Sequence, residues 1–291
     1  MPTLKEIKGR IGSVKSTLKI TSAMKLVSSA KLRKAQNAIA AMRPYEEELR
    51  KMLEMASGAG GVTETVTSPA KTANFAGDVP ENVTSPAVIT AVASNSSLCG
   101  GFNANVIAKV RAVRKPGDVV YSIGRKMADA MARDGFHSPS DYSALSEHPV
   151  YADAAAIVEK LAENFYEGRI SGVTLVYTHF VSTAKQVPVA ERLLPVDETR
   201  GQVGGEETDA ILEPSARELL EALIPRTLKL KLYAALLDSA AAEHAARTIA
   251  MQTATDNAEN LLSELTLQYN KSRQQKITSE ILDLAGGQAA E

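Results

Sequence analysis

Aromatic residues are scarce in this sequence of 291 residues: they make up 4%, and tryptophan is absent. Because aromatic side chains bury the largest areas, a large globular core usually recruits more of them. The single cysteine, Cys99, excludes an internal disulfide and fits a reducing compartment. No run of about 18 apolar residues occurs, which excludes a membrane-spanning helix. The formal net charge is only −1, so bulk charge does not indicate a nucleic-acid-binding protein.

The charge is distributed unevenly along the chain. Residues 1–43 carry ten Lys and Arg against one acidic residue, Glu6. Such a basic segment can bind nucleic acid, an anionic membrane or an acidic protein surface, or can simply be a solvated helix face. The scarcity of aromatics disfavours nucleic acid, and a narrow apolar stripe disfavours a lipid-facing helix. A transit peptide is disfavoured because the helical pattern continues without a cleavage-like break. An acidic protein partner is therefore the better functional interpretation.

The N-terminal segment is predicted to be a long helix. Thr3, with Glu6 three residues on, matches a capping box. Apolar residues then recur at coiled-coil spacing over about seven heptads, at Leu4, Ile7, Ile11, Val14, Leu18, Leu32, Ala35, Ile39, Met42, Leu49 and Leu53. The middle of this seam is polar, at Thr21, Lys25 and Ser28. Pro44 removes one helical hydrogen bond, so we expect a kink or an interruption there, with the helix resuming at Tyr45 and ending near Ser57.

The middle of the chain changes character. Residues 57–85 are rich in Gly, Ser, Thr and Pro and are predicted to form a linker. Strands are then predicted at Ala87–Ala93, Val119–Ile123, Val173–Val181 and Gln186–Leu194, and helices at Asn103–Arg114, Arg125–Arg133 and Ala152–Glu167. This alternation predicts a small α/β domain with a partly parallel sheet.

The C-terminal segment has 60 residues between Pro225 and Gly286 without a glycine or a proline. As one helix it would be roughly 90 Å long, so it must pair with another helix, protrude or enter a partner. One seam comprises Leu228, Leu232, Ala235, Ala242, Ala246 and Ile249, and it is expected to resume at Ile277, Ile281 and Leu284. Between these runs the seam positions are polar and the apolar residues shift to Leu262 and Leu265, so the contact stripe is expected to drift around the helix.

These patterns together predict an α/β protein with a long antiparallel coiled coil, formed by the N- and C-terminal helices, and a small Rossmann-like α/β domain. The expected segments are a coiled-coil helix over 1–57, a linker over 58–85, the α/β domain over 86–207 and a second coiled-coil helix over 208–291.

The loop Ser94–Asn103 lies between a predicted strand and a predicted helix. Such a loop can cradle phosphate with its amides, but its spacing is neither a P-loop nor a dinucleotide fingerprint. A tight turn that packs strand against helix is the favoured interpretation. Cys99 is expected to be a buried thiol rather than a nucleophile, since no histidine lies near it in the sequence. The four histidines have no metal-site spacing: His137, His148, His179 and His244.

Several segments resemble the gamma subunits of F-type ATP synthases, and the likeness covers nearly the whole chain. They are Ile20–Val27, Arg43–Tyr45, Ser94–Asn103, Ala245–Met251, Ala254–Asn257, Tyr269–Gln274 and Ile277–Glu280. The chain departs from that pattern at Asn95, Ser96, Ser97 and Gln288.

The resemblance implies a central-stalk rotor that couples rotation of a c-ring to conformational changes at the catalytic sites of beta subunits. The implied partners are the hexamer of alpha and beta subunits, the epsilon subunit and the c-ring. No catalytic residue, cofactor, metal or nucleic acid is expected, and membrane association is expected only through the complex. The implied location is the cytoplasmic face of the bacterial inner membrane, or the mitochondrial matrix side for a processed organellar protein.

The resemblance also implies a set of rotor–stator contact residues. Met24 matches a position near an acidic lever loop of the beta subunit, and Arg247 matches a position that interacts with that loop. The others match positions near the beta subunit's catch loop or the same bearing: Arg273, Gln274, Thr278 and Glu280. A seam residue or a solvated residue is the competing interpretation for each.

Two rival functions remain open at this point. One is a two-helix scaffold that binds an acidic partner without rotating, and the other is a nucleotide-binding α/β enzyme with a coiled-coil appendage.

Overall fold

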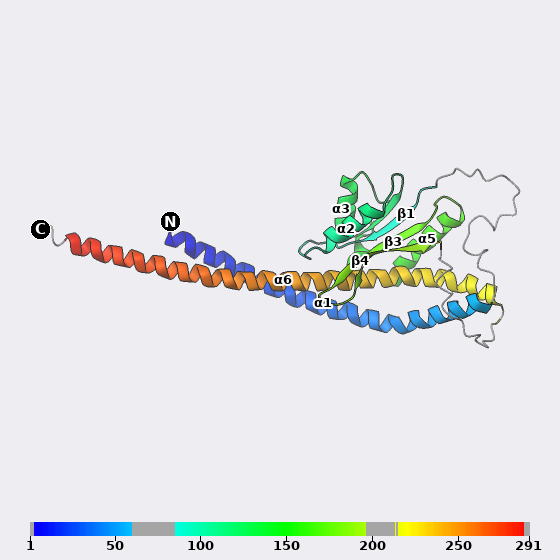
Figure 1. The fold of residues 1–291 in the computed structure, drawn as a ribbon, viewed down its shortest axis with the longest axis horizontal. Coiled ribbons are helices and arrows are strands. Elements are labelled where there is room, and N and C mark those ends of the chain that lie inside the picture. The colour runs from blue at the N-terminus through cyan, green and yellow to red at the C-terminus, as the bar shows by residue number, and fades with distance from the viewer. Residues whose placement is uncertain (1–2, 60–84, 196–212, 214, 288–291) are drawn as a thin grey trace. The chain divides into compact units, whose positions relative to one another are not determined.

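The computed structural model describes residues 3–59, 85–195, 213 and 215–287 (Figure 1). They form two compact units, one of residues 1–30 with 247–291 and the other of residues 31–246. The helices are α1 (Leu4–Ala59), α2 (Phe102–Val113), α3 (Arg125–Arg133), α4 (Ser143–Glu147), α5 (Tyr151–Tyr166) and α6 (Ala216–Gly287). The strands are β1 (Val88–Val92), β2 (Val119–Ile123), β3 (Val173–Phe180) and β4 (Gln186–Leu194).

Helix α1 begins with the predicted capping box. The backbone N–H of Thr3 donates to the carboxylate of Glu6 at 2.9 Å, and the N–H of Glu6 donates to the Thr3 hydroxyl at 3.3 Å. The expected interruption at Pro44 is wrong, because α1 continues through Pro44 to Ala59. Pro44 cannot donate to the carbonyl of Ala40, but both residues are exposed, so water can satisfy that carbonyl.

Helix α6 begins at Ala216, before the interval that lacks glycine and proline, and carries an exposed Pro225 near its start. Ser215 caps it, since the N–H of Glu218 donates to the Ser215 hydroxyl at 3.3 Å. A Ser followed three residues later by a Glu is a capping-box signal that the sequence already contains.

The seam predicted along α6 is only partly correct. Leu228, Leu232 and Ala242 are buried, but Ile249 is 40% exposed. The predicted drift is confirmed, because Leu265 is buried at 8% exposure.

Within the second unit, α1 and α6 run antiparallel. Leu32 clusters with Ala241 and Ala245, whereas Leu49, further along α1, clusters with Leu223 and Leu230. Moving along the pair in one direction, residue numbers increase on α1 and decrease on α6. This antiparallel arrangement is the one that the sequence predicted for the two terminal helices.

The sheet has the order β2-β1-β3-β4. Strands β2 and β3 lie parallel to β1, and β4 runs antiparallel to β3. The predicted strands and the three predicted helices of this region are thus confirmed within a residue or two, as is the partly parallel sheet. Helix α4 was not predicted, since five residues are too few to show a helical period.

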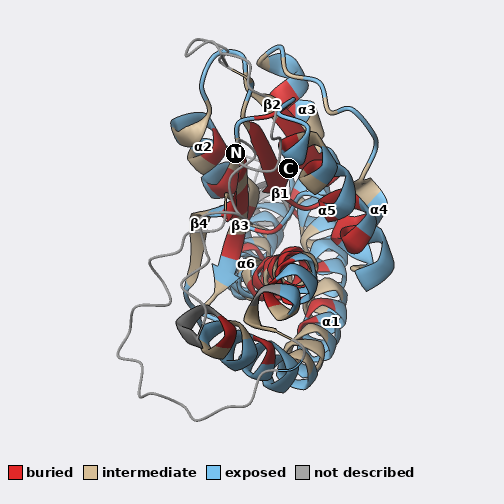
Figure 2. Ribbon diagram, turned by 90° about the vertical axis from the view of Figure 1, so that its right-hand side faces the viewer, coloured by how far each residue is buried: buried red, intermediate tan, exposed pale blue. Residues whose placement is uncertain are grey.

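Each face of the sheet has its own apolar cluster. One face packs against α5 and α6 through Val88, Val92, Val158, Leu161, Leu232 and Leu236. The other face packs against α2 and α3 through Ile89, Ala91, Val106, Val110, Met127 and Met131. Figure 2 shows β1 in the colour of buried residues, whereas β3 alternates between buried and intermediate residues over most of its length. The sheet is therefore covered on both sides, as expected for strands that read as near-continuous apolar runs.

The carboxyl ends of β1 and β2 are held close together. Gly124 follows β2 with a φ of +99°, and a Cβ there would lie 2.1 Å from the carbonyl oxygen of Ala93. The hydroxyl of Ser146 in α4 donates to that same oxygen at 2.6 Å. Only glycine suits this position, because both the backbone angle and the space exclude a side chain.

Candidate functional site

All six predicted contact residues lie in the first unit, where α1 and α6 form a narrow seam. The α1 side presents buried Ile7, Thr21 and Ser28, with Val14 half-buried between them at the same seven-residue interval. The α6 side presents buried Met251, Thr255, Ala258 and Leu265. The repeat of seven is that of a coiled coil, so the predicted seam is confirmed over this stretch.

A polar contact crosses the middle of this seam. The hydroxyl of Thr255 donates to the hydroxyl of Thr21 at 3.0 Å, and it also lies 2.8 Å from the carbonyl of Met251 in its own helix. The hydroxyl of Thr21 donates to the carbonyl of Leu18 at 3.1 Å. Both threonines are buried and hydrogen-bonded, so the polar middle of the predicted seam costs no unsatisfied group here.

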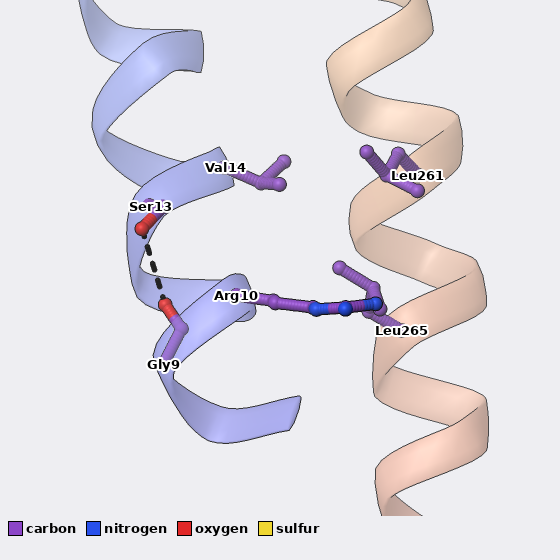
Figure 3. A pocket seen from close by; sticks show the side chains of 6 residues that line it. All are labelled: Gly9, Arg10, Ser13, Val14, Leu261 and Leu265. Carbon is purple, nitrogen blue, oxygen red and sulfur yellow. Dashed lines mark hydrogen bonds between the residues drawn. The ribbon is translucent and has the colours of Figure 1, made fainter. Parts of the chain in front are cut away.

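Near the start of α1 the seam opens into a groove of about 410 Å³ lined by Gly9, Arg10, Ser13, Val14, Leu261 and Leu265 (Figure 3). The close-up shows Val14 pointing towards Leu261 and the Arg10 side chain reaching across towards Leu265. Val14 facing Leu261, with Thr21 facing Thr255, again makes the helices antiparallel. Gly9 leaves open space in this groove, since a Cβ added there would meet nothing within 4 Å.

Met24 and Arg247 flank the polar contact. Met24 is one helical turn from Thr21 and is half-buried. Arg247 is two turns before Thr255 and only 7% exposed. Neither residue is presented fully at the surface, and their roles as contact residues stay predictions.

The other four predicted residues lie near the end of α6. Arg273 and Gln274 are exposed, the hydroxyl of Thr278 donates to the carbonyl of Gln274 at 2.9 Å, and Glu280 lies 3.7 Å from Lys276 in an exposed ion pair. Every residue from 273 to 282 is exposed.

The expected buried seam at Ile277 and Ile281 is therefore wrong, since these residues are 43% and 60% exposed. In the antiparallel register given by the Thr21–Thr255 contact, Leu4 at the start of α1 lies level with about residue 272 of α6. Helix α1 therefore does not extend far enough to lie beside Ile277 and Ile281. The side chain of Leu284 lies outside the part of the chain that the structure describes.

The six residues consequently form two groups rather than one site. Arg273 to Glu280 lie roughly 27 to 38 Å beyond Thr255 along α6, whereas Arg247 lies about 12 Å before it.

Large apolar side chains are exposed in the first unit. On α1 they are Ile20, Leu26 and Val27, at 60%, 69% and 58% exposure, and on α6 Leu267 is 73% exposed.

The loop Ser94–Asn103, in the second unit, is filled by its own side chains. The Asn103 carbonyl oxygen accepts the N–H of Ser94 at 3.1 Å, and its amide group donates to Cys99 Sγ at 3.2 Å. Cys99 is 2% exposed and clusters with Phe102 and Ala242. The prediction of a packing turn with a buried thiol is confirmed.

Asn95, one of the departures from the family pattern, bridges two helices in the second unit. Its carbonyl oxygen accepts the N–H of Arg125 at the start of α3, and its amide donates to the carbonyl of Ser143 at the start of α4. An aspartate can accept the first bond but cannot donate the second.

Across the described ranges, no three His, Cys, Asp or Glu side chains are grouped as a metal site would require. In the same ranges no helix has the length and apolarity needed to cross a bilayer.

The structure also brings together charged residues that the sequence analysis missed, in the second unit. His179 of β3 pairs with Asp238 of α6, and Glu191 of β4 pairs with Lys231 of α6. These partners are far apart in the chain, so spacing could not reveal them. Desolvation raises the pKa of Asp238, and the nearby His179 partly offsets that effect.

An antiparallel helix pair in each unit, with an α/β domain between the two helices in the sequence, defines a coiled-coil protein with an inserted domain. The family described as ATP synthase matches residues 3–290. ATP synthase gamma chains of Bacteroides fragilis and Pelotomaculum thermopropionicum are 45% and 38% identical, over 100% of this chain and 100% and 99% of theirs. The chain therefore belongs to the family of ATP synthase gamma chains.

Solved structures share the fold. A chain of the Euglena gracilis mitochondrial ATP synthase, from its OSCP, F1 and c-ring assembly, aligns with a TM-score of 0.68 and 20% identity over 99% of this chain and 94% of that one. A chain from the rotor of the same synthase aligns with a TM-score of 0.64 and 19% identity, over 94% of this chain and 98% of that one. At this identity the likeness supports the fold, including the pair of long helices with a small mixed sheet between them.

Proposed function

We propose that this chain is the central-stalk rotor of a proton-translocating F-type ATP synthase. It couples rotation of a c-ring to conformational changes at the catalytic sites of the beta subunits, for ATP synthesis or hydrolysis. The observation that carries this proposal is the full-length match to gamma chains together with the paired terminal helices. Long helices without interior glycine over most of α6 supply the stiffness that a shaft needs.

The shaft surface is proposed to contact the alpha and beta subunits at two levels. Met24 and Arg247 form the first, and Arg273, Gln274, Thr278 and Glu280 form the second. Arg273 is exposed and has the planar fork that binds a carboxylate through two hydrogen bonds. Exposed Ile20, Leu26 and Val27 support a shaft that is enclosed by other proteins. Differential contacts of this kind allow one shaft to favour different states of its three beta partners.

The α/β domain is proposed to span residues 86–207 and to bind the epsilon subunit and the c-ring. The coiled-coil helices are proposed at 1–57 and 208–291, of which the first continues to Ala59, and the linker predicted at 58–85 falls almost wholly outside the described residues. Membrane association then runs only through the complex, at the cytoplasmic face of the bacterial inner membrane.

The chain is proposed to do no bond chemistry of its own. Cys99, the one thiol, is 2% exposed and hydrogen-bonded, so a substrate could reach it only after the loop opened. Purified full-length chain should hydrolyse no ATP. Turnover that co-purifies with the chain and is abolished in Cys99→Ala would instead favour the enzyme interpretation.

The decisive experiment is co-expression of the tagged chain with the alpha, beta, epsilon and c subunits of its own operon or genome. We expect all four to be recovered with the tagged chain in a stoichiometric complex that hydrolyses ATP. Recovery of a single acidic protein, with no alpha or beta subunit, would support the non-rotating scaffold instead.

A further inference from the structure

Helix α6 is joined to the α/β domain of the second unit by apolar packing and by polar contacts, of which two reach the strands of the sheet. The apolar part includes Leu232 and Leu236 of α6 against Leu175 of β3. Apolar burial holds surfaces together but has no preferred direction, so it resists separation better than it resists sliding or turning. Directional contacts are what fix the angle of a helix about its own axis.

The first polar link is made by Lys231. Its Nζ lies 3.3 Å from the carboxylate of Glu191 and donates to the carbonyl of Arg192 at 3.1 Å, both on β4. The Tyr177 hydroxyl, from the neighbouring strand, donates to the same Glu191 carboxylate at 3.4 Å. The Lys231 and Glu191 side chains are 29% and 30% exposed, so water screens this pair less than an ion pair on the open surface.

The second polar link is made by Asp238. Its carboxylate pairs with Nδ1 of His179 and also accepts a hydrogen bond from the backbone N–H of Phe180. The Asp238 side chain is 18% exposed and that of His179 is 49% exposed, and Arg43 of α1 is a further charge that acts on Asp238. One carboxylate thus holds two consecutive residues at the end of β3.

The two links are matched in spacing. Lys231 and Asp238 are seven residues apart, which places them on one face of α6, about 10 Å apart along the helix axis. On the sheet, Glu191 pairs with Leu175, four residues before His179, which is about 13 Å along the strand. A helix that is held by one polar link can turn about that link. Two links on the same face of the helix prevent this turning.

We propose that Lys231–Glu191 and Asp238–His179 form a two-point clamp through which the α/β domain turns helix α6. This inference rests on the proposed rotor function, and it assigns to these residues the positioning of the shaft relative to the domain that receives torque. A further ion pair, Lys229–Glu159, joins α6 to helix α5 rather than to the strands of the sheet, so it does not belong to the clamp.

The test uses the assembled complex, with the alpha–beta hexamer fixed and a bead on the c-ring, and measures the variance of the bead angle while rotation is paused. Lys231→Met and Asp238→Ala each remove one of the two links, since neither new side chain can form the bonds of the original, so the variance should rise roughly two-fold in each, and further in the double variant. Asp238→Ala introduces a strong helix former and removes a charge whose burial is unfavourable, so loss of folding is not expected to account for the change.

Two further variants separate the clamp from a general loss of stability. Exchange of the partners, Lys231→Glu with Glu191→Lys, should return the variance towards the wild-type value. Lys51→Met is the matched control, because Lys51 pairs with Glu48 inside α1 at 2.7 Å and joins nothing to the domain; its variance should not change. Thermal unfolding of each complex is measured in parallel.

A double variant that rotates with wild-type variance would overturn the clamp while leaving the rotor function intact. A rise in variance that the exchanged pair does not reverse would also overturn it. A wild-type complex that assembles but never turns would overturn the proposed function itself, and the torque role with it.

Discussion

The hydroxyl groups of Thr21 and Thr255 lie 3.0 Å apart in the buried seam of the first unit, although 234 residues separate them in the sequence. This single contact fixes the register in which α1 meets α6. A shift of one heptad in either direction would place Thr255 against Val14, or Thr21 against Leu262, and so set a hydroxyl against an apolar side chain.

Replacing both threonines should reveal this coupling. Thr21→Val and Thr255→Val each remove the hydrogen bond between the two hydroxyls, while the remaining hydroxyl keeps its bond to a carbonyl of its own helix, so each should destabilise the seam by about 0.5 to 1.5 kcal/mol. The double variant should be less destabilised than the sum, with a coupling of about 0.5 to 1.5 kcal/mol. Hydrogen exchange of the backbone amides around both residues measures the stability of the seam in each variant, and hence the coupling. Thr17→Val is the control, because exposed Thr17 bonds only to Ser13 in its own helix; strict additivity of Thr21 and Thr255 would contradict the register role.

Filling the start of α1 should stabilise it. A Cβ added at Gly9 or Gly12 would meet nothing within 4 Å, so alanine improves helix propensity without a clash. Gly9→Ala and Gly12→Ala should each stabilise the first turns by about 0.5 to 1 kcal/mol, seen as slower hydrogen exchange. Gly124→Ala is the opposite case, since its Cβ would lie 2.1 Å from a backbone oxygen. A loss of protection in Gly9→Ala would show that the groove is needed for packing.

A cation at position 24 should weaken coupling between rotation and catalysis. Met24→Lys places a second ammonium group beside Lys25 and should over-strengthen contact with an acidic loop of the beta subunit. Fewer protons pumped per ATP hydrolysed are expected in membrane vesicles, with assembly unchanged. Met24→Leu keeps the apolar character and should behave as wild type. An unchanged ratio in Met24→Lys would argue against a role of this residue at the stator.

The Asp134 ion pair should give a defined pH dependence. Its carboxylate accepts two hydrogen bonds from Arg111, at 2.8 and 3.0 Å, and these hold the pKa of Asp134 below its ordinary value of 3.8. A lowered pKa in the folded state means that the charged form stabilises the fold. That contribution is complete above the ordinary pKa and is lost as the pH falls through the lowered one.

Asp134→Asn should therefore lower the thermal unfolding temperature by the same amount at pH 7 and at pH 5. The difference from wild type should shrink only below about pH 4. Arg111→Gln should return the Asp134 carboxylate towards its ordinary pKa in an NMR titration. A wild-type titration midpoint at or above 3.8 would contradict the proposed pairing.

The sequence by itself determined the elements of this protein and its family. Val119–Ile123 and Arg125–Arg133 have the predicted bounds because apolar runs and glycine stops are local signals. The capping box at Thr3 and the seven-residue repeat from Ile7 to Ser28 are local in the same sense, since hydrogen bonds within a turn and the helical period are set by near neighbours.

Only the tertiary structure decided which distant residues meet. The periodicity of α6 could not show that Ile277 and Ile281 are exposed, because that depends on where α1 begins in the register set by Thr21 and Thr255. It could not pair Asp238 with His179 or Lys231 with Glu191, since an ion pair across a sheet and a helix leaves no mark in spacing. Pro44 was misjudged for the same reason: propensity counts the lost hydrogen bond, whereas exposure to water decides what that loss costs.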